Sequence, residues 1–182
     1  MLVGFKLGMR TIFSFPSLVN ENSARLVAAG VVLQVVGYLL IRNGWLLAIL
    51  ALGFLARVLT GPTLSPLGQL VTRVLTPLVE RAIGTSPKLV PGPPKRFAQM
   101  IGLVFSTTAG GLHFFGYPGW AMAVIGAIGL AATAESVFGY CLGCQIFGVA
   151  MKVGLVPETV CEACGDITAR LQANGTTLGT QT

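Results

Sequence analysis

The chain has 182 residues, of which 53% are hydrophobic and only 10% are charged. A soluble domain carries about 25% charged residues, so this chain lacks the polar surface of a soluble globular enzyme, and that class is largely excluded. The net charge is +6, and the sequence contains no block of consecutive basic residues, which argues against nucleic-acid binding. In a membrane protein, an excess of basic residues indicates which loops face the cytoplasm.

The N-terminal third predicts a short arm followed by a helical hairpin in the membrane. Residues 1–23 form the arm, and its last four residues, 20–23, offer several helix-capping side chains. We expect a first span over 24–41 and a second over 45–60, joined by a tight turn at 42–44. Both are short for spans of about 20 residues.

An amphipathic helix is predicted between the second and third spans. From Leu67 to Ile83 the apolar residues recur with the i, i+3, i+4 spacing of one helix face. Ser65 and Pro66 form a pair typical of an N-cap and first helical residue, and Pro77 should kink the helix. Two placements remain open: the helix lies in the membrane interface, or it packs on the bundle without contacting lipid.

The second half of the chain predicts two further spans. A stiff basic loop over 87–96 precedes a third span at 97–115, and an uncharged turn at 116–119 leads to a fourth span at 120–140. The fourth span is rich in small residues, which let helices approach closely in lipid. The four spans together make a transmembrane domain over 24–140.

The remainder is a cysteine-rich cap over 141–172 and a polar, disordered tail over 173–182. Four spans place both termini on one side of the lipid bilayer. Arg42 is the one Lys or Arg on the opposite side, so the positive-inside rule predicts that both termini are cytoplasmic. The oligomeric state is not encoded in any pattern that we recognise.

All four cysteines lie in the predicted cap, as two C-x-x-C pairs. Cys141 and Cys144 form the first pair, Cys161 and Cys164 form the second, and sixteen residues separate the two pairs. This spacing is typical of a tetrahedral zinc site, because two thiolates three residues apart can face one ion and a second pair completes the tetrahedron. The glycine at position 165 suits the tight turn of a zinc knuckle.

Thiol chemistry is the alternative interpretation of the same residues. The cytoplasm is reducing, so a permanent disulfide is not expected. A working C-x-x-C needs a lowered thiol pKa, typically at a helix N-terminus. Gly139 and Gly143 could break the chain before a helix at 146–156, which favours Cys141 and Cys144 as the working pair. The expected partner is then a cytoplasmic thioredoxin-like protein or sulfurtransferase, with exchange of a disulfide or a persulfide.

Three other polar residues lie near the predicted spans. Arg57 and Glu135 fall at similar depths near the cytoplasmic border, and we predict that they form a structural ion pair. Glu135 also precedes Cys141 by less than two turns, so it could tune the thiols. His113 lies at the outer end of the third span and cannot share the cysteine site. No catalytic triad, carboxylate pair or phosphate-binding loop is present.

Four segments of the chain resemble a bacterial membrane family called domain of unknown function 4395. They cover residues 19–25, 64–67, 92–99 and 137–144, and the resemblance extends over about 19–166. The resemblance implies a small polytopic protein of the bacterial plasma membrane with a tetracysteine C-terminal region. It implies no assigned reaction, and it adds weight to a sulfur or thiol role.

The sequence therefore predicts an all-α integral membrane protein with four spans, an interfacial helix and a cytoplasmic cysteine cap. The leading functional hypothesis is a scaffold or docking protein whose cap is held by zinc on Cys141, Cys144, Cys161 and Cys164. The second is a membrane-bound thiol or persulfide handler. The third is a small transporter, for which Arg57 and Glu135 would mark the polar path.

Overall fold

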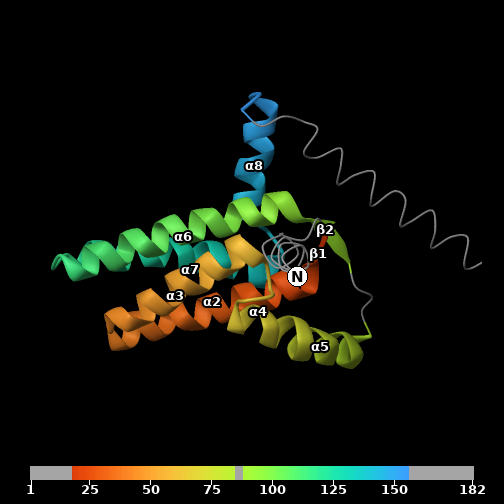
Figure 1. The fold of residues 1–182 in the computed structure, drawn as a ribbon, viewed down its shortest axis with the longest axis horizontal. Coiled ribbons are helices and arrows are strands. Elements are labelled where there is room, and N and C mark those ends of the chain that lie inside the picture. The colour runs from red at the N-terminus through yellow and green to blue at the C-terminus, as the bar shows by residue number, and fades with distance from the viewer. Residues whose placement is uncertain (1–17, 85–87, 156–182) are drawn as a thin grey trace, which may run out of the picture.

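Four long helices running side by side dominate this computed structural model, which describes residues 18–84 and 88–155 (Figure 1). Their bounds are α2 at Glu21–Ile41, α3 at Gly44–Thr60, α6 at Gly92–Phe114 and α7 at Pro118–Phe138. They coincide with the four predicted apolar segments, and the all-helical class is confirmed. The predicted tail at 173–182 and most of the predicted arm lie outside the described residues.

Side-chain caps explain where the first two helices begin. The Asn20 side chain caps α2 by accepting a hydrogen bond from the backbone N–H of Asn22 at 2.9 Å. The Asn43 side chain caps α3 in the same way, accepting from Trp45 at 2.9 Å. Between the two helices, Arg42 adopts a left-handed conformation with φ of 56° and closes the predicted tight turn. Because Asn20 is the cap, α2 begins three residues before the predicted start of the first span.

A two-stranded antiparallel ribbon ties the start of α2 to the start of α6. Strand β1 (Leu18–Asn20) pairs with β2 (Leu89–Pro91), and Leu18 lies opposite Pro91. The Glu21 N–H extends the pairing by donating to the Lys88 carbonyl at 2.8 Å. The sequence did not predict this ribbon, whose strands are three residues long and fall in the predicted arm and loop. It brings both helix starts to the same end of the bundle.

The amphipathic segment is helical over its predicted length but is interrupted by a π-helical turn. It comprises α4 (Pro66–Leu70), the π-helical η1 (Val71–Leu75) and α5 (Thr76–Ile83). The predicted cap is confirmed, since the Ser65 hydroxyl accepts from Gly68 N–H at 3.2 Å. The π turn directly precedes Pro77, which has no N–H to donate to the preceding turn.

This segment packs on α2 along one side and is exposed on the other. Leu67 lies so close to Gly30 that a Cβ there would be 2.7 Å from the Leu67 Cδ1. The Ser23 and Thr76 hydroxyls are hydrogen bonded at 2.9 Å. The opposite side leaves large apolar residues exposed, among them Leu70 and Leu78. Contact with the bundle is therefore present, and contact with lipid stays a prediction.

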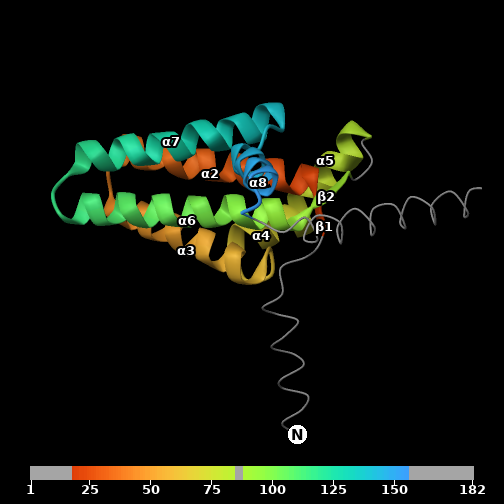
Figure 2. The ribbon, with the colours of Figure 1, turned by 90° about the horizontal axis from the view of Figure 1, so that it is seen from above.

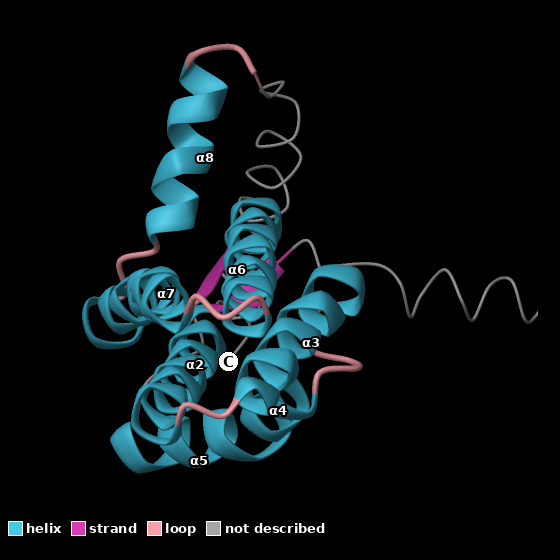
Figure 3. Ribbon diagram, turned by 90° about the vertical axis from the view of Figure 1, so that its left-hand side faces the viewer, coloured by secondary structure: helices cyan, strands magenta, loops and turns pink. Residues whose placement is uncertain are grey.

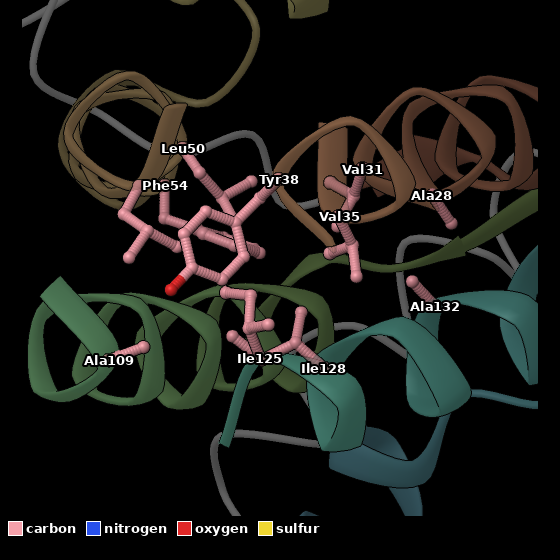
Figure 4. Packing of buried hydrophobic residues seen from close by; sticks show 11 residues of the cluster. Ala28, Val31, Val35, Tyr38, Leu50, Phe54, Ala109, Ile125, Ile128 and Ala132 are labelled. Carbon is pink, nitrogen blue, oxygen red and sulfur yellow. The ribbon is translucent and has the colours of Figure 1, made fainter. Parts of the chain in front are cut away.

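Apolar side chains from all four long helices form the core (Figure 4). In this bundle α2 packs on α7, α3 packs on α6, and α6 packs on α7 (Figure 2). Close approach depends on glycines, because Gly102 of α6 lies against the ring of Phe54 and Gly129 of α7 lies against Val35. This pairing of helices decides which polar side chains can meet at the bundle end.

Two of the helices, α2 and α7, are long and apolar enough to cross a membrane. Helix α3 is apolar but has 17 residues, and α8 (Leu142–Lys152) is apolar but has 11. Helix α6 has 23 residues and carries Lys95 and Arg96 in its first turns. These properties suggest membrane association, and the four spans and their orientation remain a proposal.

Candidate thiol site

The first cysteine pair lies at the N-terminus of α8, which projects away from the bundle (Figure 3). Helix α7 ends at Gly139, whose φ of 69° suits a residue without a Cβ. Cys141 is the N-cap residue of α8, and Cys144 is in its first turn. The predicted break at Gly139 is confirmed. The following helix, predicted at 146–156, instead begins at Leu142, so the cysteines themselves occupy the helix start.

Gly143, between the two cysteines, presses the start of α8 against α6. A Cβ at Gly143 would lie 2.4 Å from the Ala98 Cβ and 2.6 Å from the Ala98 Cα. Four residues further along α8, the Phe147 ring packs on Phe97, with centroids 5.6 Å apart. The two contacts hold the thiol pair beside the first turns of α6.

A partly buried ion pair accompanies the thiols. The Lys95 ammonium of α6 binds the Glu135 carboxylate of α7, and the two side chains are only 12% and 16% exposed. Helix geometry accounts for it: α6 and α7 pack together, and Cys141 follows α7 after a short connection. A lysine and a carboxylate are thereby placed next to a pair of thiols, an arrangement that can shift thiol acidity in either direction.

The predicted ion pair between Arg57 and Glu135 is not formed. Arg57 donates from Nε to the Gln99 Oε1 at 2.9 Å and from Nη1 to the Ser65 Oγ at 3.4 Å. The reason is the order of the helices: α3 packs on α6, so Arg57 reaches Gln99, whereas Lys95 of α6 reaches Glu135 of α7. Depth along the bundle, on which the prediction rested, does not specify which helix faces which.

The two thiols differ in acidity. A hydrogen bond with Cys144 is the main cause that holds the pKa of Cys141 below the ordinary thiol value, and the Lys95 ammonium acts in the same direction. Burial and the Glu135 carboxylate oppose that shift. The same hydrogen bond, together with burial, raises the pKa of Cys144. Cys141 is therefore the thiol that ionises first, and Cys144 is its hydrogen-bond donor.

An open cleft of about 290 Å³ lies beside the thiol pair. Cys141 and Cys144 line it together with Lys88, Lys95 and Gln145. On its other side, Cys141 borders a smaller cavity of about 200 Å³ inside the bundle, which Glu135 also lines. Cys141 is buried and Cys144 is partly exposed. The two lysines of the cleft are each paired with a carboxylate, Lys88 with Glu21 and Lys95 with Glu135.

The second cysteine pair, Cys161 and Cys164, lies outside the described residues, so the geometry of the tetracysteine site stays a prediction. Within 18–84 and 88–155, no three potential metal-ligating side chains gather at one point. The two described cysteines have the correct chemistry for half of a zinc site. Their spacing within one helix start also suits thiolate ligation.

His113 lies at the far end of the bundle from the cysteines. It is in the last turn of α6, whereas the cysteines contact the first turns of that helix. Its Nδ1 is hydrogen bonded to the Tyr38 hydroxyl at 3.0 Å, and its ring packs over Gly44. His113 therefore contacts α2 and α3 at the bundle end opposite the cysteines. Its predicted separation from the cysteine site is confirmed.

The sequence did not predict that Lys95 lies beside the thiols and lowers the pKa of Cys141. We assigned residues 87–96 to a stiff loop because of their prolines, but α6 begins at Gly92. Prolines are tolerated in the first turn of a helix, where no intrahelical N–H bond is lost. The Pro-Pro-Lys-Arg run was therefore also the pattern of a helix start, with Lys95 already in the helix.

Comparison with known proteins identifies one relationship. The family model described as Domain of unknown function (DUF4395) matches residues 19–152. The matched segment contains the whole described helical bundle and Cys141 and Cys144, and it ends before Cys161. No curated protein and no solved structure matches the chain.

Proposed function

The chain belongs to the DUF4395 family, and from that premise we propose that it is a multi-pass protein of the bacterial plasma membrane that exchanges disulfides through Cys141 and Cys144 at the cytoplasmic face. One observation carries the thiol proposal: the cysteine pair occupies the N-terminus of α8 beside the partly buried Lys95–Glu135 ion pair. Helix N-termini and neighbouring cations are the two usual means of activating a cysteine.

The exposed apolar surface supports the membrane location. Only 28% of the most apolar window of α2 and 22% of that of α7 is buried by the rest of the described chain. A core helix of a soluble protein would be mostly buried. Large apolar side chains also remain exposed on α3 and α6, including Leu52 and Val104. Lipid is the environment that makes such a surface favourable.

The distribution of charge supports the orientation. Arg25, Lys88, Lys95 and Arg96 lie at the bundle end that carries β1, β2 and α8 (Figure 1). At the other end, the two turns contain one basic residue, Arg42. By the positive-inside rule the thiol end faces the cytoplasm, where a thioredoxin-like protein is available as partner.

The exchange reaction uses the two thiols in sequence. The Cys141 thiolate attacks a sulfur of the partner's disulfide, forms a mixed disulfide, and releases the partner's other sulfur as a thiolate that takes up a proton. Cys144 then loses its proton and attacks the Cys141 sulfur of the mixed disulfide, releasing the second partner thiol. The partner's disulfide gains two electrons and the Cys141/Cys144 pair loses two.

The test is a thiol titration on protein that keeps only the first pair. We would use the C161S/C164S variant as the background, reduce it fully, and add an aromatic disulfide whose released thiolate is coloured. The expected release is two equivalents per chain, because the second thiol resolves the first mixed disulfide. Adding C144S should give one equivalent and a stable adduct on Cys141. Equal slow release from both cysteines would refute the proposal.

The pH dependence of the first step is a second readout. Because the Lys95 ammonium lowers the pKa of Cys141, K95Q should move the midpoint of the pH–rate profile to higher pH. Because the Glu135 carboxylate raises that pKa, E135Q should move the midpoint to lower pH. Opposite shifts of the two midpoints indicate a direct electrostatic effect on Cys141. A general loss of structure would instead shift both midpoints in the same direction.

Zinc binding is the second candidate, favoured by a second C-x-x-C that is separated from the first by sixteen residues. Its measurement is metal content and free-thiol count on one anaerobically purified sample of the full chain. One zinc per chain, with thiols that react only after a chelator is added, would replace exchange by a structural or docking role. Absence of metal together with rapid titration would support exchange.

A further inference from the structure

Another cavity lies at the thiol end of the bundle, between α2 and the α4–η1–α5 segment. Its volume is about 440 Å³. Part of its wall is apolar and includes Val27, Pro62 and Pro77. The polar part of its wall comes from β1 and from α2, α3, η1, α5 and α6, and it includes Asn20, Arg57, Glu80, Lys95 and Gln99. A cavity with this mixed wall suits a ligand with both a polar and an apolar part.

Arg57 is the most unusual residue of that wall. It is only 5% exposed, yet among the described residues no carboxylate lies within ion-pairing distance of it. Its Nε and Nη1 are bound by Gln99 and Ser65, both uncharged, and its Nη2 has no hydrogen-bond partner in the described chain. The Phe54 ring, 4.7 Å from the guanidinium carbon, supplies a weaker contact.

The other charged residues of the cavity already have partners. Lys95 is bound to Glu135. The Glu80 Oε1 accepts hydrogen bonds from the side-chain amides of Asn20, at 2.8 Å, and Asn22, at 3.1 Å. Glu80 also has no cationic partner among the described residues, but it is only partly buried and accepts these two hydrogen bonds. Arg57 differs because it is buried and its Nη2 is unbound within the described chain, and burying such a charge is costly unless an anion compensates it.

From this geometry we propose that the cavity is a binding site for a phosphate-type oxyanion, held by the Arg57 guanidinium between α2 and α4–α5. A planar guanidinium pairs well with phosphate oxygens. The apolar wall would hold a hydrophobic part of the ligand. The same chemistry could be presented by the headgroup of an anionic phospholipid or by a free oxyanion. This site is separate from the thiol proposal and does not depend on it.

The experiment measures ligand-dependent thermal stability of the full chain purified in a neutral detergent. Three probes are titrated separately: inorganic phosphate, short-chain phosphatidylglycerol, and short-chain phosphatidylcholine, which carries phosphate but no net charge. A ligand that binds only the folded protein raises the unfolding temperature with concentration. Stabilisation by phosphatidylglycerol alone identifies a lipid headgroup, and stabilisation by inorganic phosphate identifies a free oxyanion.

Variants connect the effect to Arg57. R57Q should weaken binding of the stabilising probe roughly tenfold or more, since it removes a charge-assisted contact. R73Q removes the same charge from an exposed position on η1 that does not line the cavity, and it should bind like the wild type. If R57Q does not fold, the affinity of R57K for the stabilising probe is measured instead. Lysine keeps the charge but lacks the planar guanidinium, so R57K should bind several-fold more weakly than the wild type.

The outcomes separate clearly. Loss of binding in R57Q with retention in R73Q, or a several-fold loss in R57K, supports the site. The proposal is overturned if neither anionic probe stabilises the wild type, if phosphatidylcholine stabilises it as well as phosphatidylglycerol does, or if R57Q and R73Q bind equally. An R57K affinity equal to that of the wild type likewise overturns it.

Discussion

Substitution of Gly143 by alanine tests whether the thiol pair depends on close packing between α8 and α6. The added Cβ would lie 2.4 Å from the Ala98 Cβ and 2.6 Å from the Ala98 Cα. One of these atoms belongs to the backbone, so no side-chain rotation can relieve the contact. Helix α8 must move away from α6, carrying Cys141 and Cys144 with it. Overpacking of this kind costs about 1–3 kcal/mol.

Gly148 supplies a matched control in the same helix. A Cβ there meets nothing within 4 Å, so G148A should gain only the helix preference of alanine over glycine, about 0.5–1 kcal/mol. G143A gains the same preference but also suffers the clash. The difference between the two variants therefore isolates the contact with Ala98, and we expect it to be about 1–3 kcal/mol.

Hydrogen exchange of the α8 amides is the suitable assay, because it measures local opening of this helix without unfolding the bundle. The expected difference corresponds to exchange roughly 5- to 150-fold faster in G143A than in G148A. Adding A98G to G143A removes the nearer contact but leaves the backbone one, so recovery should be partial. Equal exchange rates in G143A and G148A would refute the packing argument.

Two further predictions concern the bundle itself. G102A should destabilise the fold by about 1–3 kcal/mol, because its Cβ would lie 2.4 Å from the Phe54 ring. G110A, on the same helix, is the control, because a Cβ there meets nothing within 4 Å. Equal free energies of unfolding for the two variants, measured by denaturant unfolding in detergent, would contradict this reasoning. Y38F should lower the free energy of unfolding by about 0.5–1.5 kcal/mol, because it removes the hydrogen bond between the buried Tyr38 and His113. Unchanged stability in the same assay would contradict this prediction.

The positions of the long helices could be predicted because their signals are local. Apolar runs mark the helix interiors, and Asn20, Asn43 and Ser65 mark starts through side chains that accept from nearby backbone N–H groups. The same signals place the turn at Arg42. Helix α6 was placed too late because prolines were interpreted as loop residues, although a first turn accepts them. The β1–β2 ribbon could not be predicted, since each strand has three residues and its pairing partner is distant in the chain.

The candidate site was predicted only in its local part. Cys141 and Cys144 are three residues apart, so their proximity follows from the sequence. The partner of Glu135 does not follow from the sequence. The sequence indicates how far along a helix a residue lies, but which residue faces it depends on which helices pack together. Helix α6 lies next to both α3 and α7, so it supplies Gln99 to Arg57 and Lys95 to Glu135. Neither assignment can be made from single-helix patterns.

Helix α6 thus connects both proposed sites through residues one turn apart. Lys95 lines the thiol cleft and also the oxyanion cavity, and Gln99, four residues later, holds the Arg57 guanidinium. Residues four apart lie on one face of a helix, so the same face of α6 orients the cation beside the thiols and the cation in the cavity. Gly143 rests on Ala98 of that same stretch. The first two turns of α6 therefore fix the relative positions of the thiol pair, its ion pair and the arginine, whereas the Tyr38–His113 hydrogen bond lies at the far end of the bundle.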